Sequence, residues 1–202
     1  LQTGDTPDGF FCRECVGWIE DFELGTVDPF LNIDNGEILN PNAFSGLMNS
    51  VTDSVDGDDG VVDGFGNAGY SWFTGADNAD DSHVTISFAT PVKNAGLVFT
   101  DGDRSSTNVS LEAFDSNGVS LGIINAGDLA DDFFTGQTEE DTFMGFQDTE
   151  GRIASMTLSL DAGIGIEIDH VHWQEVCEIP EPGTGVLAFM GILGLIGFRR
   201  RR

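Results

Sequence analysis

The amino-acid sequence predicts an all-β domain, an antiparallel β-sandwich or barrel, followed by a hydrophobic helix at the C-terminus. Three observations lead to this prediction. Apolar and polar residues alternate in short runs, turn-forming residues separate these runs, and an uncharged apolar segment, Gly183 to Phe198, lies close to the chain end. Alternation with a period of two indicates strands with one buried face. Several such strands at close spacing are typical of sandwiches and barrels.

The predicted strands follow one another with turns between them. The apolar residues of the five regular strands are, in order, Val84, Ile86 and Phe88; Ala95, Leu97 and Phe99; Val109, Leu111 and Ala113; Leu121 and Ile123; and Ile153, Met156, Leu158 and Leu160. Turns are expected at Asp101-Gly102, Ser116-Asn117-Gly118 and Ala162-Gly163, because Gly, Asn and Asp tolerate the backbone of tight turns. Residues 25–80 lack regular alternation, so we expect loops and edge strands there.

The stretch GIEIDHVHW predicts a last strand that contains an irregularity. Ile166 and Ile168 share one face of a regular strand, whereas Val171 and Trp173 have the opposite parity and are equally apolar. One extra residue in a strand, a β-bulge, moves every following side chain to the other face. We therefore predict a bulge near Asp169.

The chain is strongly acidic. Thirty-five Asp and Glu stand against eight Lys and Arg, which gives a formal net charge of −27. Nucleic acid is excluded as a partner, because binding it requires basic residues that neutralise phosphates. Cations are the natural counterions, and an acidic surface also suits a salty habitat. The chain begins at Leu1 rather than Met, as expected of an exported protein that has lost its secretory signal, and also of a fragment.

The C-terminal segment has three parts in a fixed order. They are Pro180, Glu181 and Pro182, then the apolar run, then Arg199, Arg200, Arg201 and Arg202. The apolar run is somewhat shorter than the roughly 20 residues of a membrane-spanning helix. Arginines that follow such a run can reach the membrane interface and hold that end on the cytoplasmic side. The alternative is a helix buried in a soluble core with a basic tail.

These three parts resemble the PEP-CTERM sorting signal that exosortase recognises on exported proteins of Gram-negative bacteria. The resemblance implies an exported domain, residues 1–177, and a sorting signal, residues 178–202. It implies that an exosortase-type membrane transpeptidase is a partner and that the signal enters the inner membrane transiently and is then removed. The mature protein is then expected at the cell surface or outside the cell.

A second resemblance covers most of residues 18–175. The segments WIEDFELG, ISFATPVKNAGLVFTD and GIEIDHVHW are similar to those of the exported jelly-roll β-sandwich that often precedes a PEP-CTERM signal and is related in shape to carbohydrate-binding modules. The resemblance implies a structural Ca²⁺ between the first and last strands, held by Glu23 and Asp169, with Asp21 as a lesser candidate. The alternative is that Asp21 and Glu23 only face solvent.

A Gly-rich acidic loop gives a less defined metal prediction. It contains Asp53, Asp56, Asp58, Asp59 and Asp63. Their spacing matches no standard ligand pattern. The loop either binds calcium weakly or is solvated.

The three cysteines allow two readings. Cys12 and Cys15 form a C-x2-C pair, and Cys177 lies just before the sorting signal. In an exported protein, a disulfide from Cys12 or Cys15 to Cys177 is favoured, because it would close a long loop and join the ends of the domain. The alternative is a zinc site made of the three thiolates with His170 or His172.

Catalytic motifs are missing from the sequence. It contains no G-x-S-x-G, no H-E-x-x-H and no phosphate-binding loop, so we predict a protein that is not an enzyme. Tyr70 and Trp72 lie in the Gly-rich stretch GYSWFTG, where an exposed aromatic face next to polar groups would suit a sugar ring. The alternative is that Trp72 anchors this loop in the core.

Three functions are consistent with the sequence. The first is a non-catalytic cell-surface or extracellular-matrix protein that contributes to biofilm or envelope structure. The second is a carbohydrate-binding module, with an exopolysaccharide as partner. The third is a self-assembling subunit of an extracellular filament, in which sheet edges or terminal segments join neighbouring copies.

Overall fold

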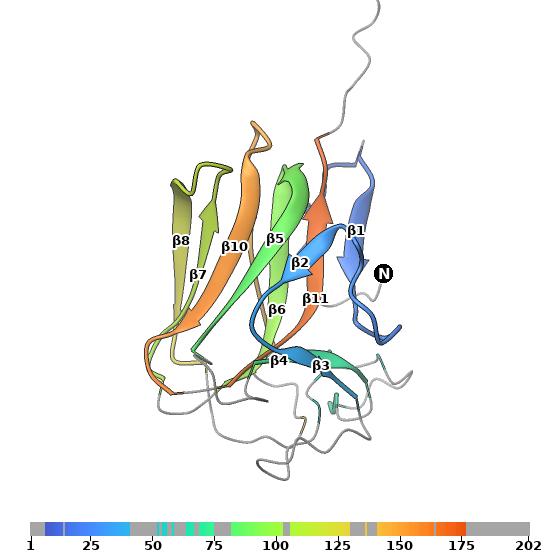
Figure 1. The fold of residues 1–202 in the computed structure, drawn as a ribbon, viewed down its shortest axis with the longest axis vertical. Helices are drawn as coiled ribbons and strands as arrows, with labels where there is room; N and C mark the ends of the chain where they lie inside the picture. The colour runs from blue at the N-terminus through green and yellow to red at the C-terminus, as the bar shows by residue number, and fades with distance from the viewer. Residues whose placement is uncertain are drawn as a thin grey trace, which may run out of the picture.

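The fold is a sandwich of two antiparallel β-sheets (Figure 1). The structure, a computed structural model, describes residues 7–13, 15–40, 52, 54–55, 58, 64–66, 69–74, 82–102, 106–129, 136, 141–163 and 165–176. The prediction of an all-β sandwich is confirmed within these residues. The predicted C-terminal helix, the sorting signal and Cys177 lie outside them.

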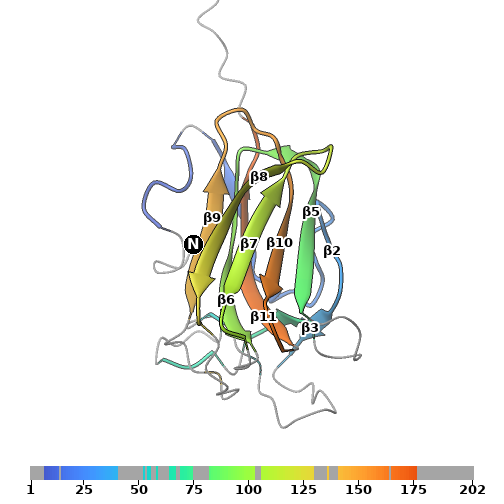
Figure 2. The same ribbon diagram turned by 90° about the vertical axis from the view of Figure 1, so that its left-hand side faces the viewer.

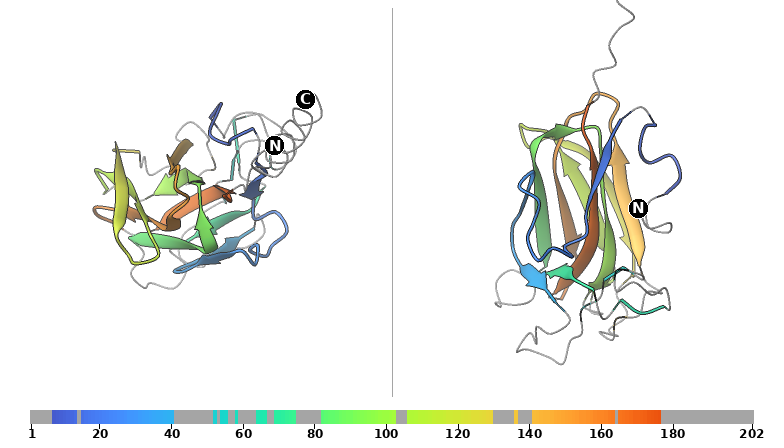
Figure 3. Two further views of the ribbon diagram at one scale, coloured as in Figure 1. Left: turned by 90° about the horizontal axis from the view of Figure 1, so that it is seen from above. Right: turned by 90° about the vertical axis from the view of Figure 1, so that its right-hand side faces the viewer.

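The first sheet has six strands. They are β1 (Gly17–Glu20), β3 (Glu37–Leu39), β4 (Ser71–Phe73), β6 (Asn94–Gly102), β9 (Thr142–Gln147) and β11 (Ile166–Gln174). Their order is β3-β4-β11-β6-β9, and β1 also pairs with β11. The first and last strands of the described chain therefore lie side by side, as Figures 1 and 3 show.

The second sheet has five strands. They are β2 (Leu31–Ile33), β5 (His83–Val92), β7 (Val109–Phe114), β8 (Ser120–Gly127) and β10 (Ile153–Leu160). Their order is β2-β5-β10-β7-β8. The long strands of both sheets run along the long direction of the molecule (Figure 2), whereas the short strands β3 and β4 lie across it (Figure 1).

The core lies between the two sheets and comes from the alternation that the sequence predicts. On β5, Val84 and Ile86 are fully buried, and Leu111 on β7 and Leu158 on β10 are buried beside them. The polar residues between them, such as Thr85, face outward and are only partly buried. Burying a large aliphatic side chain contributes about 1.5–3 kcal/mol, so this alternating set stabilises the sandwich.

The outer face of the first sheet is covered by the N-terminal segment. Phe10 packs edge-on against Phe143 of β9, with ring centroids 4.9 Å apart. The backbone of the segment is held by side-chain amides, since Asn94 Nδ2 donates to the Phe10 carbonyl oxygen at 2.7 Å and Gln147 Nε2 donates to the same oxygen at 2.8 Å. This segment also contacts the end of β11, where Phe11 lies against His172. Together with the segment that contains Val55 and Asp58, it leaves all nine residues of β11 buried.

One strand was not predicted from the sequence, and three short strands occur in the region where edge strands were expected. Strand β9 was not predicted, because its segment TFMGFQ is apolar at both parities. Three short strands, β2, β3 and β4, form where loops and edge strands were expected. The strands predicted from alternation all occur.

Candidate metal centre

The predicted bulge occurs in the middle of β11. Asp169 pairs with Val98 of β6 and His172 pairs with Gly96, so three steps along β11 match two steps along β6. His170 has a φ of 44°, a left-handed backbone that few residues other than Gly adopt. Ile168 before the bulge and Trp173 after it both reach the core, although their parities differ. The prediction of a bulge near Asp169 is confirmed.

The other edge of β11 changes partner at the same place. Strand β4 pairs with Glu167 and Ile168, and β1 pairs with Val171 to Gln174. Asp169 and His170 therefore lie between the two partner strands. Other groups must satisfy their polar atoms there, because unpaired polar groups are costly to bury.

Asp169 is fully buried and accepts two backbone hydrogen bonds. Its Oδ2 accepts from the Val55 N–H at 2.8 Å, and its Oδ1 accepts from the His170 N–H at 2.7 Å. Burial raises the pKa of Asp169 well above its ordinary value, and the Asp58 carboxylate acts in the same direction, whereas His170 lowers it. The negative charge of Asp169 is thus held at a free-energy cost.

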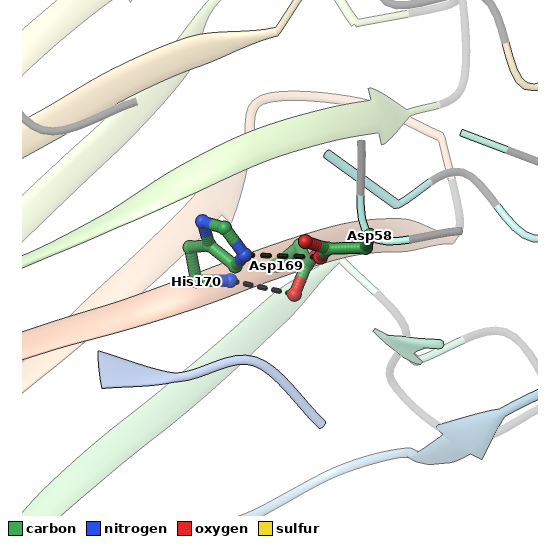
Figure 4. A group of neighbouring side chains, drawn as sticks. All are labelled: Asp58, Asp169 and His170. Carbon is green, nitrogen blue, oxygen red and sulfur yellow. Dashed lines mark hydrogen bonds and ion pairs between the residues drawn. The ribbon is translucent and has the colours of Figure 1, made fainter. Parts of the chain in front are cut away.

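Asp58 and His170 complete a cluster with Asp169 (Figure 4). His170 Nε2 lies 3.0 Å from Asp58 Oδ2, and each of the two side chains is only 4% exposed. One ligand atom from each of the three residues lies within 4.8 Å of the others. Their spacing would allow the three residues to bind one metal ion.

Glu23 belongs to the same electrostatic neighbourhood. Its Oε1 accepts a hydrogen bond from the Tyr70 N–H at 2.5 Å. Burial raises the pKa of Glu23, the carboxylates of Asp58 and Asp21 raise it further, and the Tyr70 hydrogen bond and His170 lower it. Asp58 and His170 thus act on both Glu23 and Asp169.

Gly69 leaves the space that Glu23 uses. A Cβ atom at Gly69 would lie 3.0 Å from Glu23 Oε1 and 2.1 Å from the Ser54 hydroxyl oxygen. Asp21, the third residue of the calcium prediction, has a local role, because its Oδ1 accepts from the Glu23 N–H at 3.2 Å. Glu23 is therefore linked electrostatically to Asp58 and His170, whereas the group of described residues whose ligand atoms come close together is Asp58, Asp169 and His170. Asp21 supports the Glu23 backbone.

The donor set fits a divalent cation. Two carboxylates, from Asp58 and Asp169, lie together with one histidine that carries at most one positive charge. The Glu23 carboxylate lies near enough for Asp58 and His170 to shift its pKa. Buried carboxylates require neutralisation, and carboxylate oxygens are the ligands that Ca²⁺ prefers. Because His170 adds an imidazole nitrogen to the carboxylate oxygens, the site would also suit first-row transition metals.

Sequence reasoning did not single out Asp58 and His170 as partners of Asp169. Asp58 is separated from His170 by 112 positions and is one of several acids in its loop. The predicted bulge was the available signal, since bulges often occur beside sites. It indicated an irregular backbone at Asp169, which is where the cluster forms.

The two aromatic residues of the glycan prediction are at least partly buried. Trp72 is 8% exposed, its ring centroid lies 6.1 Å from that of Phe22, and its Nε1 donates to the Asn35 carbonyl oxygen at 3.2 Å. Tyr70 is half-buried against the core. Trp72 therefore anchors its loop in the core, as the alternative expected, and its ring face is not open to a sugar.

The cysteines do not fit the zinc alternative. Cys15 is disulfide-bonded and Cys12 is free, so three thiolates cannot assemble. His172 is packed against aromatic rings, with its centroid 5.2 Å from that of Phe143. Cys177, the third cysteine of the favoured disulfide prediction, lies outside the described residues.

Several solved structures share parts of this strand arrangement at low similarity. The K2 cleaved adhesin domain of Lys-gingipain has 8% sequence identity and a TM-score of 0.49, covering 78% of this chain and 99% of that one. A family 35 carbohydrate-binding module from Clostridium thermocellum has 11% identity and a TM-score of 0.40, covering 80% and 99%. A mutant family 29 carbohydrate-binding module has 8% identity and a TM-score of 0.39, covering 79% and 92%.

The remaining comparisons concern the sequence. No curated protein matches the chain. Within the described residues, no helix has the length and apolarity needed to cross a membrane. The family model described as the PEP-CTERM protein-sorting motif matches residues 178–202. The chain therefore ends in a PEP-CTERM sorting motif, the mark of a protein that is exported and sorted by an exosortase.

Proposed function

We propose that this chain is a non-catalytic surface protein that contributes to envelope or biofilm-matrix structure, and that a bound Ca²⁺ stabilises its β-sandwich. The observation that carries the proposal is the PEP-CTERM motif at residues 178–202. It gives the chain a route to the cell surface. At the surface, the sandwich would serve as a stable, strongly acidic structural component of the envelope or matrix.

The buried cluster supports a structural role over a catalytic one. Both carboxylate oxygens of Asp169 accept backbone N–H groups, from Val55 and His170. The ring of His170 is directed to Asp58 at 3.0 Å. A general acid or base needs to reach a substrate proton, whereas these side chains are almost fully buried and connect segments of their own chain.

Sorting is tested by replacing the four terminal arginines, Arg199 to Arg202, with glutamine. The unmodified chain is expected to reach the surface or medium with a mass that lacks residues of the sorting motif, and the variant is expected to stay unprocessed. Arg13→Gln, a change at an exposed arginine near the N-terminus, is the matched control. Recovery of all 202 residues from the surface of cells with an active exosortase would contradict the processing step.

Calcium binding follows from the charge imbalance in the cluster. Asp169 and Glu23 both have raised pKa values because burial disfavours their charged forms and Asp58 adds repulsion. A divalent cation among the three carboxylates would turn this repulsion into attraction. Bound Ca²⁺ would also join β11, the loop that contains Asp58, and the segment after β1.

The metal proposal is tested by thermal unfolding of the protein after treatment with a chelator. Adding Ca²⁺ at about 100 times its dissociation constant is expected to stabilise the folded state by about 2.7 kcal/mol. Asp58→Asn and Glu23→Gln should each weaken this effect, whereas Asp161→Asn, at an exposed carboxylate whose hydrogen-bond partners are Ser106, Thr107 and Asn108, should not. Stabilisation by Zn²⁺ or Mn²⁺ but not by Ca²⁺ would reassign the metal, and no stabilisation by any of them would refute the site.

Carbohydrate binding is a second candidate, supported by an open groove at the β9 edge of the first sheet. The groove has a volume of about 630 Å³, and its lining includes Phe10, Phe143, Phe146, Gln147 and Asp8. Aromatic faces beside amide and carboxylate groups are what sugar rings require. The groove offers these groups where the buried Trp72 does not.

Titration with a panel of bacterial exopolysaccharides tests this candidate. A saturable signal that is lost in Phe146→Ala and kept in Phe65→Ala, an exposed aromatic residue outside the groove lining, would support it. Equal binding by both variants would assign the signal elsewhere. Self-association into a filament stays a prediction, which electron micrographs of the secreted fraction would test.

A further inference from the structure

The C-x2-C pair at the N-terminus contains one free thiol and one disulfide sulfur. Cys12 is free and Cys15 is disulfide-bonded. The Cys15 N–H donates to the Cys12 carbonyl oxygen at 3.2 Å, which is the hydrogen bond of a tight turn. Residues at the two ends of such a turn have Cα atoms within about 7 Å, a separation close to that of disulfide-bonded cysteines.

One buried side chain fixes this turn in place. The amide of Gln174, which is fully buried, accepts from the Cys12 N–H at 2.8 Å and donates to the carbonyl oxygens of Cys12 and Cys15 at 3.0 and 3.1 Å. Asn94 Nδ2 donates to the same Gln174 oxygen at 2.8 Å. The two cysteines are thus held together by the end of the central strand β11.

The only lysine of the chain lies against the free thiol. Lys93 Nζ is 3.4 Å from Cys12 Sγ, although the sequence offers 35 carboxylates as partners for this ammonium group. Lys93 follows β5 directly, and its backbone N–H donates to the Gln174 carbonyl oxygen at 2.8 Å. Gln174 therefore positions both the cysteine turn and the lysine.

We propose that Cys12, Cys15 and Lys93 form a thiol–disulfide exchange centre. The thiolate of Cys12 attacks the sulfur of Cys15, and a Cys12–Cys15 bond forms as the bond between Cys15 and its present partner breaks. The partner sulfur leaves as a thiolate and takes up one proton, which replaces the proton that Cys12 released. The exchange needs no oxidant, and Lys93 donates to the Cys12 sulfur while that sulfur carries negative charge.

The exchange would release a third cysteine sulfur. Cys177 is the only other cysteine of the sequence, and the PEP-CTERM motif begins at residue 178. Cys177 is therefore the cysteine whose sulfur the exchange is expected to release.

Alkylation of the full chain, purified without reductant, tests the exchange in the absence of any exosortase. The protein is treated with N-ethylmaleimide over a wide range of concentrations, and labelled and disulfide-linked peptides are mapped by mass spectrometry. At high concentration the label is expected on Cys12. At low concentration, the exchange competes with alkylation of Cys12. The label is then expected on Cys177, together with a disulfide-linked Cys12–Cys15 peptide. Label on Cys12 alone at every concentration would overturn the proposal.

Two charge variants separate the role of Lys93 from general electrostatics. Lys93→Met is expected to slow the exchange about tenfold, the effect of losing one hydrogen bond to a charged group. Arg13→Met, beside Cys12 in sequence, is expected to leave the rate unchanged. The intrinsic alkylation rate of Cys12 is measured separately in the double variant Cys15→Ser, Cys177→Ser. Equal rates in Lys93→Met and the unmodified chain would contradict the role of Lys93.

Discussion

Strands β10 and β11 are both central strands of their sheets, and they are buried in different ways. In β10, Met156, Leu158 and Leu160 are buried in the core, while the residues between them are only partly buried. In β11 all nine residues are buried, because the N-terminal segment and the Asp58 loop cover its outer face. The polar residues of β10 therefore contact solvent. Those of β11 contact specific protein groups instead.

The difference shows where polar side chains stabilise the fold of this sandwich. On β10, Thr157 has one side-chain contact across the sheet, to the Thr85 hydroxyl at 3.1 Å, and water can replace it. On β11, Asp169 and Gln174 hold backbone groups from segments more than 100 residues away. Outer-face substitutions should therefore have small effects on β10 and large effects on β11.

The largest effect is expected for Asp169→Ala, measured by denaturant unfolding in the presence of a chelator. The change leaves the buried N–H groups of Val55 and His170 without their acceptor, and unsatisfied buried donors cost about 1–3 kcal/mol each. We expect the free energy of unfolding to fall by about 3 kcal/mol. Ser159→Ala on β10 is the matched control, with an expected change below about 0.5 kcal/mol. Similar losses in both variants would remove the contrast between the strands.

Gln174→Ala is expected to have the next largest effect. It removes the amide that holds Cys12 and Cys15, and water can reach part of this region, so we expect a loss of about 2 kcal/mol. The same variant should expose the N-terminal segment to proteolysis before the rest of the sandwich. Thr157→Ala, with one partly buried hydroxyl contact, should leave the proteolysis pattern unchanged. An unchanged proteolysis pattern in Gln174→Ala would show that the Gln174 amide is not needed to hold the N-terminal segment.

Gly96→Ala tests how closely the outer face of the first sheet is packed. A Cβ at Gly96 would lie 2.6 Å from Phe143 Cζ and 2.8 Å from the Met144 carbonyl oxygen. Overpacking of this kind costs about 1–3 kcal/mol, and we expect a lower melting temperature. Ser110→Ala on the outer face of β7 adds no atoms and is the comparison variant. A Gly96→Ala protein as stable as the unmodified one would mean that Phe143 moves aside without cost.

The smallest effect is expected at Asp161, an exposed residue at the end of β10. Hydrogen bonds from the Thr107 side chain and N–H, and from the Ser106 hydroxyl, lower the pKa of Asp161 from 3.8 to about 2. Because the folded-state pKa is depressed, this residue stabilises the fold above about pH 4 and loses that contribution as the pH falls towards 2. Asp161→Asn does not titrate, so its stability should fall less steeply over this range. If the stability of the two proteins changed in parallel with pH, the lowered pKa of Asp161 would be contradicted.

The sequence allowed most of the fold to be predicted, because alternation depends on local order alone. Strands β5, β6, β7, β8 and β10 follow directly from period-two patterns, and the parity change between Ile168 and Val171 predicted the bulge. Strand β9 gave no such pattern, since Phe10 covers its outer face and apolar residues occur at both parities.

The candidate site could be predicted only in part. The resemblance to exported jelly-roll domains pointed to Glu23 and Asp169, which lie in the first and last parts of the sandwich. Asp58 could not be chosen from its loop, because its contact with His170 spans 112 positions and several neighbouring acids have the same chemistry. The burial of Trp72 was expected as an alternative, but its partners Phe22 and Asn35 could not be identified because they come from a different segment.

The place of β11 between β6 on one edge and β1 with β4 on the other has a mechanical consequence. The described chain continues from β11 to Val176, so a protein held at a surface through its C-terminal side would receive any pulling force along this strand. Antiparallel hydrogen bonds run perpendicular to their strands, and a pull along β11 therefore loads the bonds on both edges in shear, all at once. A domain anchored in this way would resist extension by flow better than one held through an edge strand, whose bonds can open one after another.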